Sequence, residues 1–165
     1  MTNFARARPA AKTDVDINQI VHTALRLASF DEAFQNIEIS SDLAEDLAPV
    51  HADEDQLQQV FLNLFLNARD AMADGGTLSI KTLEQDEKIV IEVGDSGTGI
   101  AETDRKLIFD PFFTTKSAGK GTGLGLAVCY GIISAHGGEI SALPNAEKGT
   151  SFIVSLPIYN RSESQ

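Results

Sequence analysis

The sequence predicts an α+β fold, a two-layer α/β sandwich in which helices cover one face of a mixed sheet. Three observations lead to this prediction. Three stretches repeat apolar residues at the helical period, and other stretches alternate them as strands do. Their order is helix, strand, helix, hairpin, long loop, helix and hairpin, which lacks the repeated crossovers of a doubly wound sheet. A chain of 165 residues, 42% apolar and 22% charged, is long enough for one domain with a sizeable core.

Composition excludes several classes of protein. No apolar run approaches the ~20 residues of a membrane span, and no signal-peptide pattern opens the chain. The single cysteine, Cys129, lies among apolar residues, so we expect neither a disulfide framework nor a cysteine metal site. A net charge of −11 argues against nucleic acid and against direct membrane contact. A polyanionic ligand would need local cations or a metal ion.

The first third of the chain contains one helix and one strand. Residues 1–13 are basic and small, with Pro9, and are typical of a linker. Asp16 is expected to cap a helix that ends near Ala28, and His22 on it has no neighbour that resembles a catalytic partner. Residues 36–40 alternate as a strand, and an acidic loop follows to His51. The side of the helix expected to be buried consists of Ile17, Ile20, Val21, Ala24, Leu25 and Leu27.

Residues 53–72 form the second predicted helix, with Asp53 and Gln56 as a capping box. At ~100° per residue, Asn63, Asn67 and Asp70 stack on a face beside the apolar stripe. These residues are either the wall of a polar pocket or core amides that the backbone satisfies, and the helix alone leaves both readings open. The stripe itself comprises Leu57, Val60, Phe61, Leu64, Ala68, Ala71 and Met72.

The rest of the chain reads as two hairpins separated by a long loop and a helix. Strands are expected at 77–83 and 88–94, joined by the polar loop 84–87, and the second leads into DSGTGI at 95–100. Residues 101–122 are predicted to be a mobile lid. A helix from Gly123 is stopped by Gly137 and Gly138, strands follow at 140–143 and 149–157, and NRSESQ is a polar tail.

The glycine clusters do not match the usual nucleotide fingerprints. GTGLG at 121–125 is not G-x-G-x-x-G, and no P-loop pattern occurs. A glycine-rich loop that enters a helix N-terminus can still bind a phosphate chain, although glycines also gather in ordinary turns.

Four segments, in order, resemble the motifs of one family. NLFLNARDAM resembles an asparagine box, DSGTGI a first glycine box, FDPFFTTK a phenylalanine box, and GKGTGLGL a second glycine box. Over residues 14–157 the chain resembles the ATP-binding catalytic (HATPase) domain of bacterial sensor histidine kinases, in the GHKL superfamily with its Bergerat fold. The phenylalanine box and TGLGL point to the nitrogen-regulator-like type. The resemblance divides the chain into a linker or preceding dimerisation helix (1–13), the catalytic domain (14–158) and a tail (159–165).

The resemblance implies a role for each polar residue around the adenine and the metal. Asn67 would ligate Mg²⁺ through its amide oxygen, and Asn63 would contact the phosphates. Asp95 would accept a hydrogen bond from the exocyclic amine of adenine, with Thr150 joining it through water. The alternative for Asp95 is a carboxylate satisfied by neighbouring backbone amides. The residues expected to lie beside the base are Gly97, Gly99 and Ile100.

The lid has implied roles as well. Phe109, Phe112 and Phe113 would hinge it onto the core. Lys116 would act with Asn63 and Asn67 in catalysis, and Lys120 would meet the phosphates, unless these lysines only form a solvated basic loop. Asp70 would order water around Mg²⁺ or serve the structure. The backbone that closes over the triphosphate would be that of Gly121, Thr122, Gly123, Leu124, Gly125 and Leu126.

The hydrolytic relatives of this superfamily carry a glutamate one turn before the metal-binding asparagine. Asn63 holds that place here and cannot act as a base. The resemblance therefore implies transfer of the γ-phosphoryl group to a histidine, with little hydrolysis. Two alternatives are a serine kinase like the anti-sigma-factor kinases and a non-catalytic nucleotide-binding interaction module. Acid-labile phosphate would distinguish phosphohistidine from phosphoserine.

The phosphoacceptor is expected outside this chain. His22, His51 and His136 each lack the acidic residue and proline that follow an acceptor histidine. The opening NFAR resembles the end of a dimerisation helix, so we expect a domain of a longer kinase. Its implied partners are the dimerisation and phosphoacceptor domain and, indirectly, a response regulator. The isolated domain is expected to be monomeric and cytoplasmic, as the cytoplasmic part of a larger sensor, free or membrane-bound.

Overall fold

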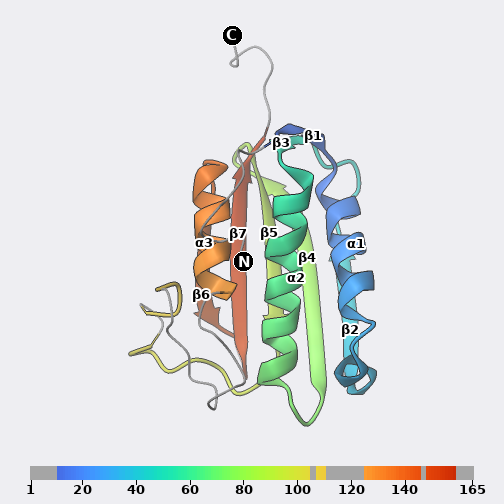
Figure 1. The fold of residues 1–165 in the computed structure, drawn as a ribbon, viewed down its shortest axis with the longest axis vertical. Helices are drawn as coiled ribbons and strands as arrows, with labels where there is room; N and C mark the ends of the chain where they lie inside the picture. Colours follow the sequence, from blue (N-terminus) through green and yellow to red (C-terminus); the bar gives the residue numbers. More distant parts are fainter. Residues whose placement is uncertain (1–10, 105–106, 111–124, 146–147, 159–165) are drawn as a thin grey trace, which may run out of the picture.

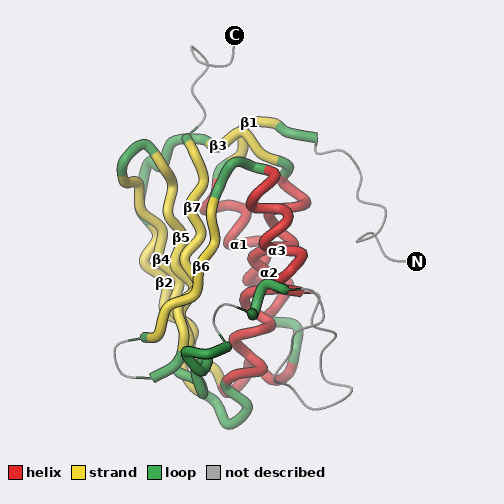
Figure 2. The backbone as a smooth tube through the Cα atoms, turned by 90° about the vertical axis from the view of Figure 1, so that its left-hand side faces the viewer, coloured by secondary structure: helices red, strands yellow, loops and turns green. Residues whose placement is uncertain are grey.

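The computed structural model describes residues 11–104, 107–110, 125–145 and 148–158. Five strands form one mixed sheet in the order β2-β4-β5-β7-β6, with β2 parallel to β4 and the other pairs antiparallel. Figure 1 shows the helices α1, α2 and α3 side by side in front of this sheet. In Figure 2 the sheet and the helices form two separate layers. The predicted α+β two-layer sandwich is confirmed.

Helix α1 (Ile17–Ala28) begins where the sequence predicts. The carboxylate of Asp16 accepts hydrogen bonds from the backbone N–H groups of Asn18 and Gln19, which satisfies two of the free donors at the helix start. One predicted core residue is wrong, because Leu27 is 40% exposed. Leu27 lies roughly 80° from the centre of the buried stripe at ~100° per residue, at the margin of the side that meets the core.

Strand β2 (Ile37–Leu43) follows a 3₁₀ turn, η1 (Glu32–Asn36), and forms an edge of the sheet. A second, two-stranded sheet joins β1 (Thr13–Val15) to β3 (Val50–Ala52). Neither strand was predicted: β1 begins at the end of the predicted linker, and β3 begins at the end of the predicted acidic loop. Strands of three residues are too short to show a period of two, so no local pattern revealed them.

Helix α2 (Glu54–Ala71) lies in the middle of the helical layer. Asp53 caps it as predicted, by accepting from the N–H of Gln56 at 3.1 Å. The second half of the predicted capping box is not made, because the N–H of Asp53 donates to Nε2 of His136 instead of to the side chain of Gln56. Its apolar stripe is buried as predicted except that Ala71 is only half-buried, and Phe65, which the prediction omitted, is buried too. Between α2 and the sheet lies the core, whose largest fully buried side chains include Phe61, Phe65, Phe152, Leu57, Leu64, Leu78 and Ile91.

The two predicted hairpins are present. Strands β4 (Gly76–Gln85) and β5 (Lys88–Asp95) are longer than predicted, because Asp86 and Glu87 form a tight turn with positive φ values of 54° and 63°. Helix α3 (Gly125–Ala135) leads to β6 (Glu139–Pro144), which pairs with β7 (Thr150–Pro157). No helix in the described part of the chain has the length and apolar character needed to cross a membrane.

Candidate functional site

Two segments that carry predicted motifs, the end of α2 and the loop after β5, meet a third segment at one end of the sandwich. The last turn of α2 lies there beside the loop that leaves β5, and the backbone N–H of Thr98 in this loop donates to the carbonyl of Ala71 at 3.2 Å. Figure 1 shows that the loop after β5 and the end of α2 share this end of the molecule. The chain between β6 and β7 completes the arrangement, because it contacts the end of β5.

Asp95 is the most buried acidic side chain of this region, at 4% exposure. Its Oδ1 accepts from the backbone N–H of Gly97 at 2.8 Å and of Thr150 at 3.3 Å. Burial raises the pKa of Asp95 above its usual range, and the two backbone donors oppose that rise. Among the described residues, every hydrogen bond to the carboxylate reaches Oδ1. Of these two donors, Gly97 is one of the neighbouring amides that the sequence offers, and Thr150 comes from a distant strand.

Two glycines let the backbone close around Asp95. A Cβ atom on Gly97 would lie 2.2 Å from the carbonyl oxygen of Ala71, so only glycine fits where the loop crosses the end of α2. Gly149 has a φ of +96°, and a Cβ there would lie 2.0 Å from the carbonyl oxygen of Asp95. The main chain on both sides of Asp95 is therefore held at a spacing that side chains would prevent.

The two asparagines of α2 lie one turn apart and are both half-buried. Asn63 lies near Cys129 of α3, whose Sγ donates to the carbonyl of Val60 at 3.6 Å. Burial raises the pKa of the Cys129 thiol to about 12, and the nearby Asn63 side chain opposes the rise. The thiol is thus protonated near neutral pH and is a packing group rather than a nucleophile.

Asp70 and Arg69 belong to an ion-pair cluster at the end of α2. Arg69 donates to Oδ1 of Asp70 through Nε at 3.0 Å and Nη2 at 2.8 Å, and its Nη1 contacts the carboxylate of Asp31. Burial alone would lower the pKa of Arg69, but the two carboxylates raise it. The backbone N–H of Ala33 and the charge of Arg69 hold the pKa of Asp31 below its usual range. Asp70 thereby helps tie α2 to the segment after α1.

The start of the predicted lid packs on the core. Ile108 is 4% exposed, and the ring of Phe109 lies 6.3 Å from Phe152 and 5.8 Å from Tyr130. Gly125 is exposed and Leu126 half-buried in the first turn of α3. The other predicted lid and glycine-loop residues lie outside the described residues, namely Phe112, Phe113, Lys116, Lys120, Gly121, Thr122, Gly123 and Leu124.

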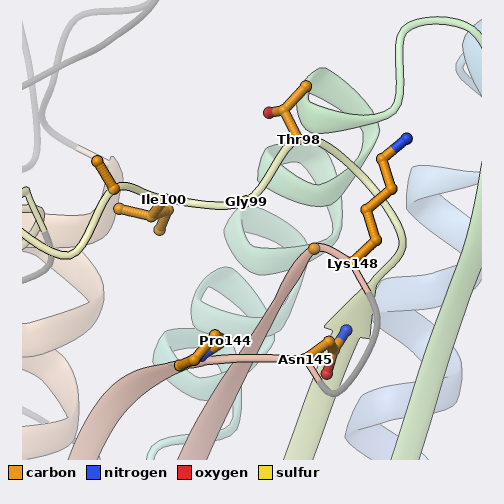
Figure 3. A pocket seen from close by; sticks show the side chains of 8 residues that line it. Thr98, Gly99, Ile100, Pro144, Asn145 and Lys148 are labelled. Carbon is orange, nitrogen blue, oxygen red and sulfur yellow. The ribbon is translucent and has the colours of Figure 1, made fainter.

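A cleft of about 530 Å³ opens between the loop after β5 and the turn between β6 and β7. Figure 3 shows Thr98, Gly99 and Ile100 on one side of it, with Pro144, Asn145 and Lys148 on the other. Gly99 and Ile100 were predicted to line the site, but the residues from the β6–β7 turn were missed. A proline, an asparagine and a glycine between two strands are ordinary turn signals, so local sequence gave no reason to assign them to a site.

No group of three or more histidine, cysteine, aspartate or glutamate side chains in the described ranges is arranged to hold a metal ion. Asn63 and Asn67 on α2 carry side-chain amide oxygens, and such oxygens suit a hard cation.

The two-layer sandwich is the fold that the four motifs implied, and it carries a buried carboxylate at the end of β5 and two amides on α2. Residues 52–160 match the family described as histidine kinase-, DNA gyrase B-, and HSP90-like ATPases. The chain belongs to this family, and within it the chain is the catalytic ATPase domain of a two-component sensor histidine kinase. The family resemblance expected from the four motifs is confirmed.

Individual relatives support this assignment. The sensor histidine kinase ZraS of Escherichia coli strain K12 is 40% identical over 144 residues, which cover 87% of this chain and 30% of that kinase. The nucleotide-free catalytic domain of histidine kinase ThkA superposes with a TM-score of 0.80 at 34% identity, covering 89% of this chain and 95% of that one. The same kinase in complex with the response regulator protein TrrA gives a TM-score of 0.81 at 30% identity, covering 95% of this chain and 45% of that one. The chain spans only 18% to 30% of the curated sensor kinases that it matches first.

Proposed function

We propose that this domain binds Mg²⁺-ATP at the end of the sandwich that holds Asp95, and that it delivers the γ-phosphoryl group to a histidine on a separate dimerisation and phosphoacceptor domain. The observation that carries this proposal is the buried Asp95 carboxylate. A carboxylate fixed by two backbone donors to Oδ1 can accept from the adenine amine at its other oxygen. Guanine has a carbonyl at the corresponding position, so the contact selects ATP over GTP.

The amides of α2 suit the phosphates and the metal. Asn67 would hold Mg²⁺ through its side-chain oxygen, and Asn63 would meet the phosphates with its N–H donors. When bound, the ion neutralises charge on the phosphate oxygens and orients them. Asn63 cannot take a proton from water, so ATP is held with little hydrolysis. Asp70 has a structural role in this proposal, because Arg69 already engages its carboxylate.

The remaining contacts come from segments that close over the nucleotide. Gly97, Gly99 and Ile100 line the base, and Thr150 joins Asp95 through water. Phe109 and Phe112 join the lid to the core. Lys116 assists phosphoryl transfer. The phosphates lie against Lys120 and the backbone of Gly121, Thr122, Gly123, Leu124, Gly125 and Leu126, at the N-terminal end of α3.

The parent kinase supplies the other components. Residues 14–158 act as the catalytic unit between a linker (1–13) and a tail (159–165). Its direct partner is the kinase's own dimerisation domain, and a response regulator receives the phosphoryl group later. We place the domain in the cytoplasm, as a monomer when isolated, without a nucleic-acid or membrane partner.

Labelled ATP tests the reaction. This chain alone should gain no stable label, whereas mixing it with its kinase's dimerisation domain should put acid-labile label on that partner. Asn67→Ala should abolish the transfer and the gain in nucleotide affinity that Mg²⁺ gives the wild type. Stoichiometric label on this chain by itself, or acid-stable label on the partner, would refute the proposal.

A further inference from the structure

Asn145 connects the β6–β7 turn to the end of β5. Its Nδ2 donates to the main-chain carbonyl of Asp95 at 2.5 Å and approaches that of Thr150 at 3.5 Å. Its Oδ1 accepts from the hydroxyl of Ser151, and its backbone N–H donates to the carbonyl of Gly149 at 3.1 Å. Two carbonyls face one end of the amide and a hydroxyl faces the other, so the nitrogen must point to Asp95.

This contact takes the place of a backbone hydrogen bond between β5 and β7. The register between β5 and β7 ends at the pair Gly94 and Ser151. One step further, the N–H of Thr150 donates to the side chain of Asp95 rather than to its main chain. The carbonyl of Asp95 therefore needs another donor, and Asn145 provides it.

We propose that Asn145 is a positioning residue for base recognition, acting through Asp95. This inference rests on the proposed adenine contact of Asp95. The carboxylate is held from two sides, because Thr150 and Gly97 fix Oδ1 while Asn145 fixes the carbonyl of the same residue. Gly149 closes the remaining space, since a Cβ there would meet that carbonyl at 2.0 Å. Without the amide, the peptide group after Asp95 can rotate and turn the carboxylate away from the amine it must accept from.

Nucleotide discrimination separates positioning from simple stabilisation of the turn. Inosine triphosphate carries a carbonyl where adenine carries its amine, so it lacks the donor for Asp95. Calorimetric titration of the wild type with ATP and with ITP, at fixed Mg²⁺, gives the discrimination that Asp95 provides. Asn145→Asp keeps the shape and the acceptor for Ser151 but places an oxygen opposite the carbonyl of Asp95. Asn145→Ala removes the donor without adding charge.

Asn18 offers a matched control. Its Nδ2 donates to the carbonyl of Ala44 at 2.7 Å and its Oδ1 accepts from the Thr82 hydroxyl, so it makes the same kind of bonds between other elements. Both Asn145 variants should lose roughly tenfold in ATP affinity, while their ITP affinity changes by less than about threefold. Asn18→Asp should lower the melting temperature and leave the ATP/ITP ratio unchanged.

A wild-type ratio of ATP to ITP affinity in folded Asn145 variants, whether both affinities fall equally or neither falls, would overturn the inference while the proposed function stands. A wild type that binds ATP and ITP equally would overturn the adenine contact of Asp95 and this inference with it. Circular dichroism and the melting temperature of each variant establish that it is folded before titration.

Discussion

Asp95 shows how a single residue can weaken the fold while serving the site. Its carboxylate lies in a buried position that raises its pKa, so ionising it inside the protein is less favourable than in water. The raised pKa means that the ionised form lowers native stability at neutral pH. That loss is relieved as the pH falls through the raised pKa, because the native state then takes up a proton.

Asp95→Asn should therefore abolish ATP binding without weakening the fold. The amide oxygen can keep the bonds from Gly97 and Thr150, while the new N–H group faces the adenine amine and repels it. We expect the variant to melt at or above the wild-type temperature at pH 7, with the difference shrinking towards pH 4. Calorimetric titration and melting curves across this range are the measurement. A folded variant with wild-type affinity would show that the base binds elsewhere.

The helices α2 and α3 are joined at the end of the sandwich that lies away from Asp95. His136, which follows α3, is 6% exposed and accepts the N–H of Asp53 at 3.0 Å through Nε2, while its Nδ1 lies 2.8 Å from the carbonyl of Ile132. A neutral ring with the proton on Nδ1 satisfies both contacts. The chain entering β1 joins the same point, because Ala11 donates to Asp53 and Lys12 to the carbonyl of Ala135. The incoming chain thus contacts both helix ends.

His136→Ala should lower the free energy of unfolding by about 1–3 kcal/mol, because it leaves the buried N–H of Asp53 without its acceptor and opens a cavity. Urea unfolding followed by circular dichroism measures the change. His22→Ala is the control, since His22 is exposed on α1 and its loss should alter stability by less than about 0.5 kcal/mol. Equal effects of the two substitutions would mean that the contact between His136 and Asp53 contributes nothing to the free energy of unfolding.

At the scale of the whole molecule, one core supports a site at one end. The buried side chains of α1, α2, α3 and the sheet form a single cluster, and Asp95, Asn63 and Asn67 lie on elements that contribute to it. Asp95 ends the central strand β5, and Asn63 and Asn67 lie on the central helix. Ligand binding at such a site is linked to the stability of the entire fold, because unfolding removes the site.

Mg²⁺-ATP at one hundred times its Kd should stabilise the native state by about 2.7 kcal/mol, which for a domain of this size raises the melting temperature by about 5–10 °C. Differential scanning calorimetry with and without nucleotide tests this. The Asp95→Asn chain should show no such rise under the same conditions. A comparable rise in that variant would point to binding that does not use Asp95.

The sequence by itself determined the three helices, the five strands of the main sheet and the family. Helical and strand periods are local, and each motif is a contiguous segment, so they can be read without coordinates. The caps Asp16 and Asp53 were equally local, since each bonds residues two or three positions away. The prediction that Leu27 is buried was wrong, because the width of a buried stripe depends on how neighbouring elements pack.

Only the tertiary structure decided the long-range contacts that hold the site and join the helices. Asn145 meets Asp95 across 50 residues, His136 meets Asp53 across 83, and Arg69 meets Asp31 across 38. The pairing of β1 with β3 is of the same kind. Such contacts depend on the folding of several elements into two layers, and a single polar residue in a turn or at a helix end has no period that would reveal its distant partner.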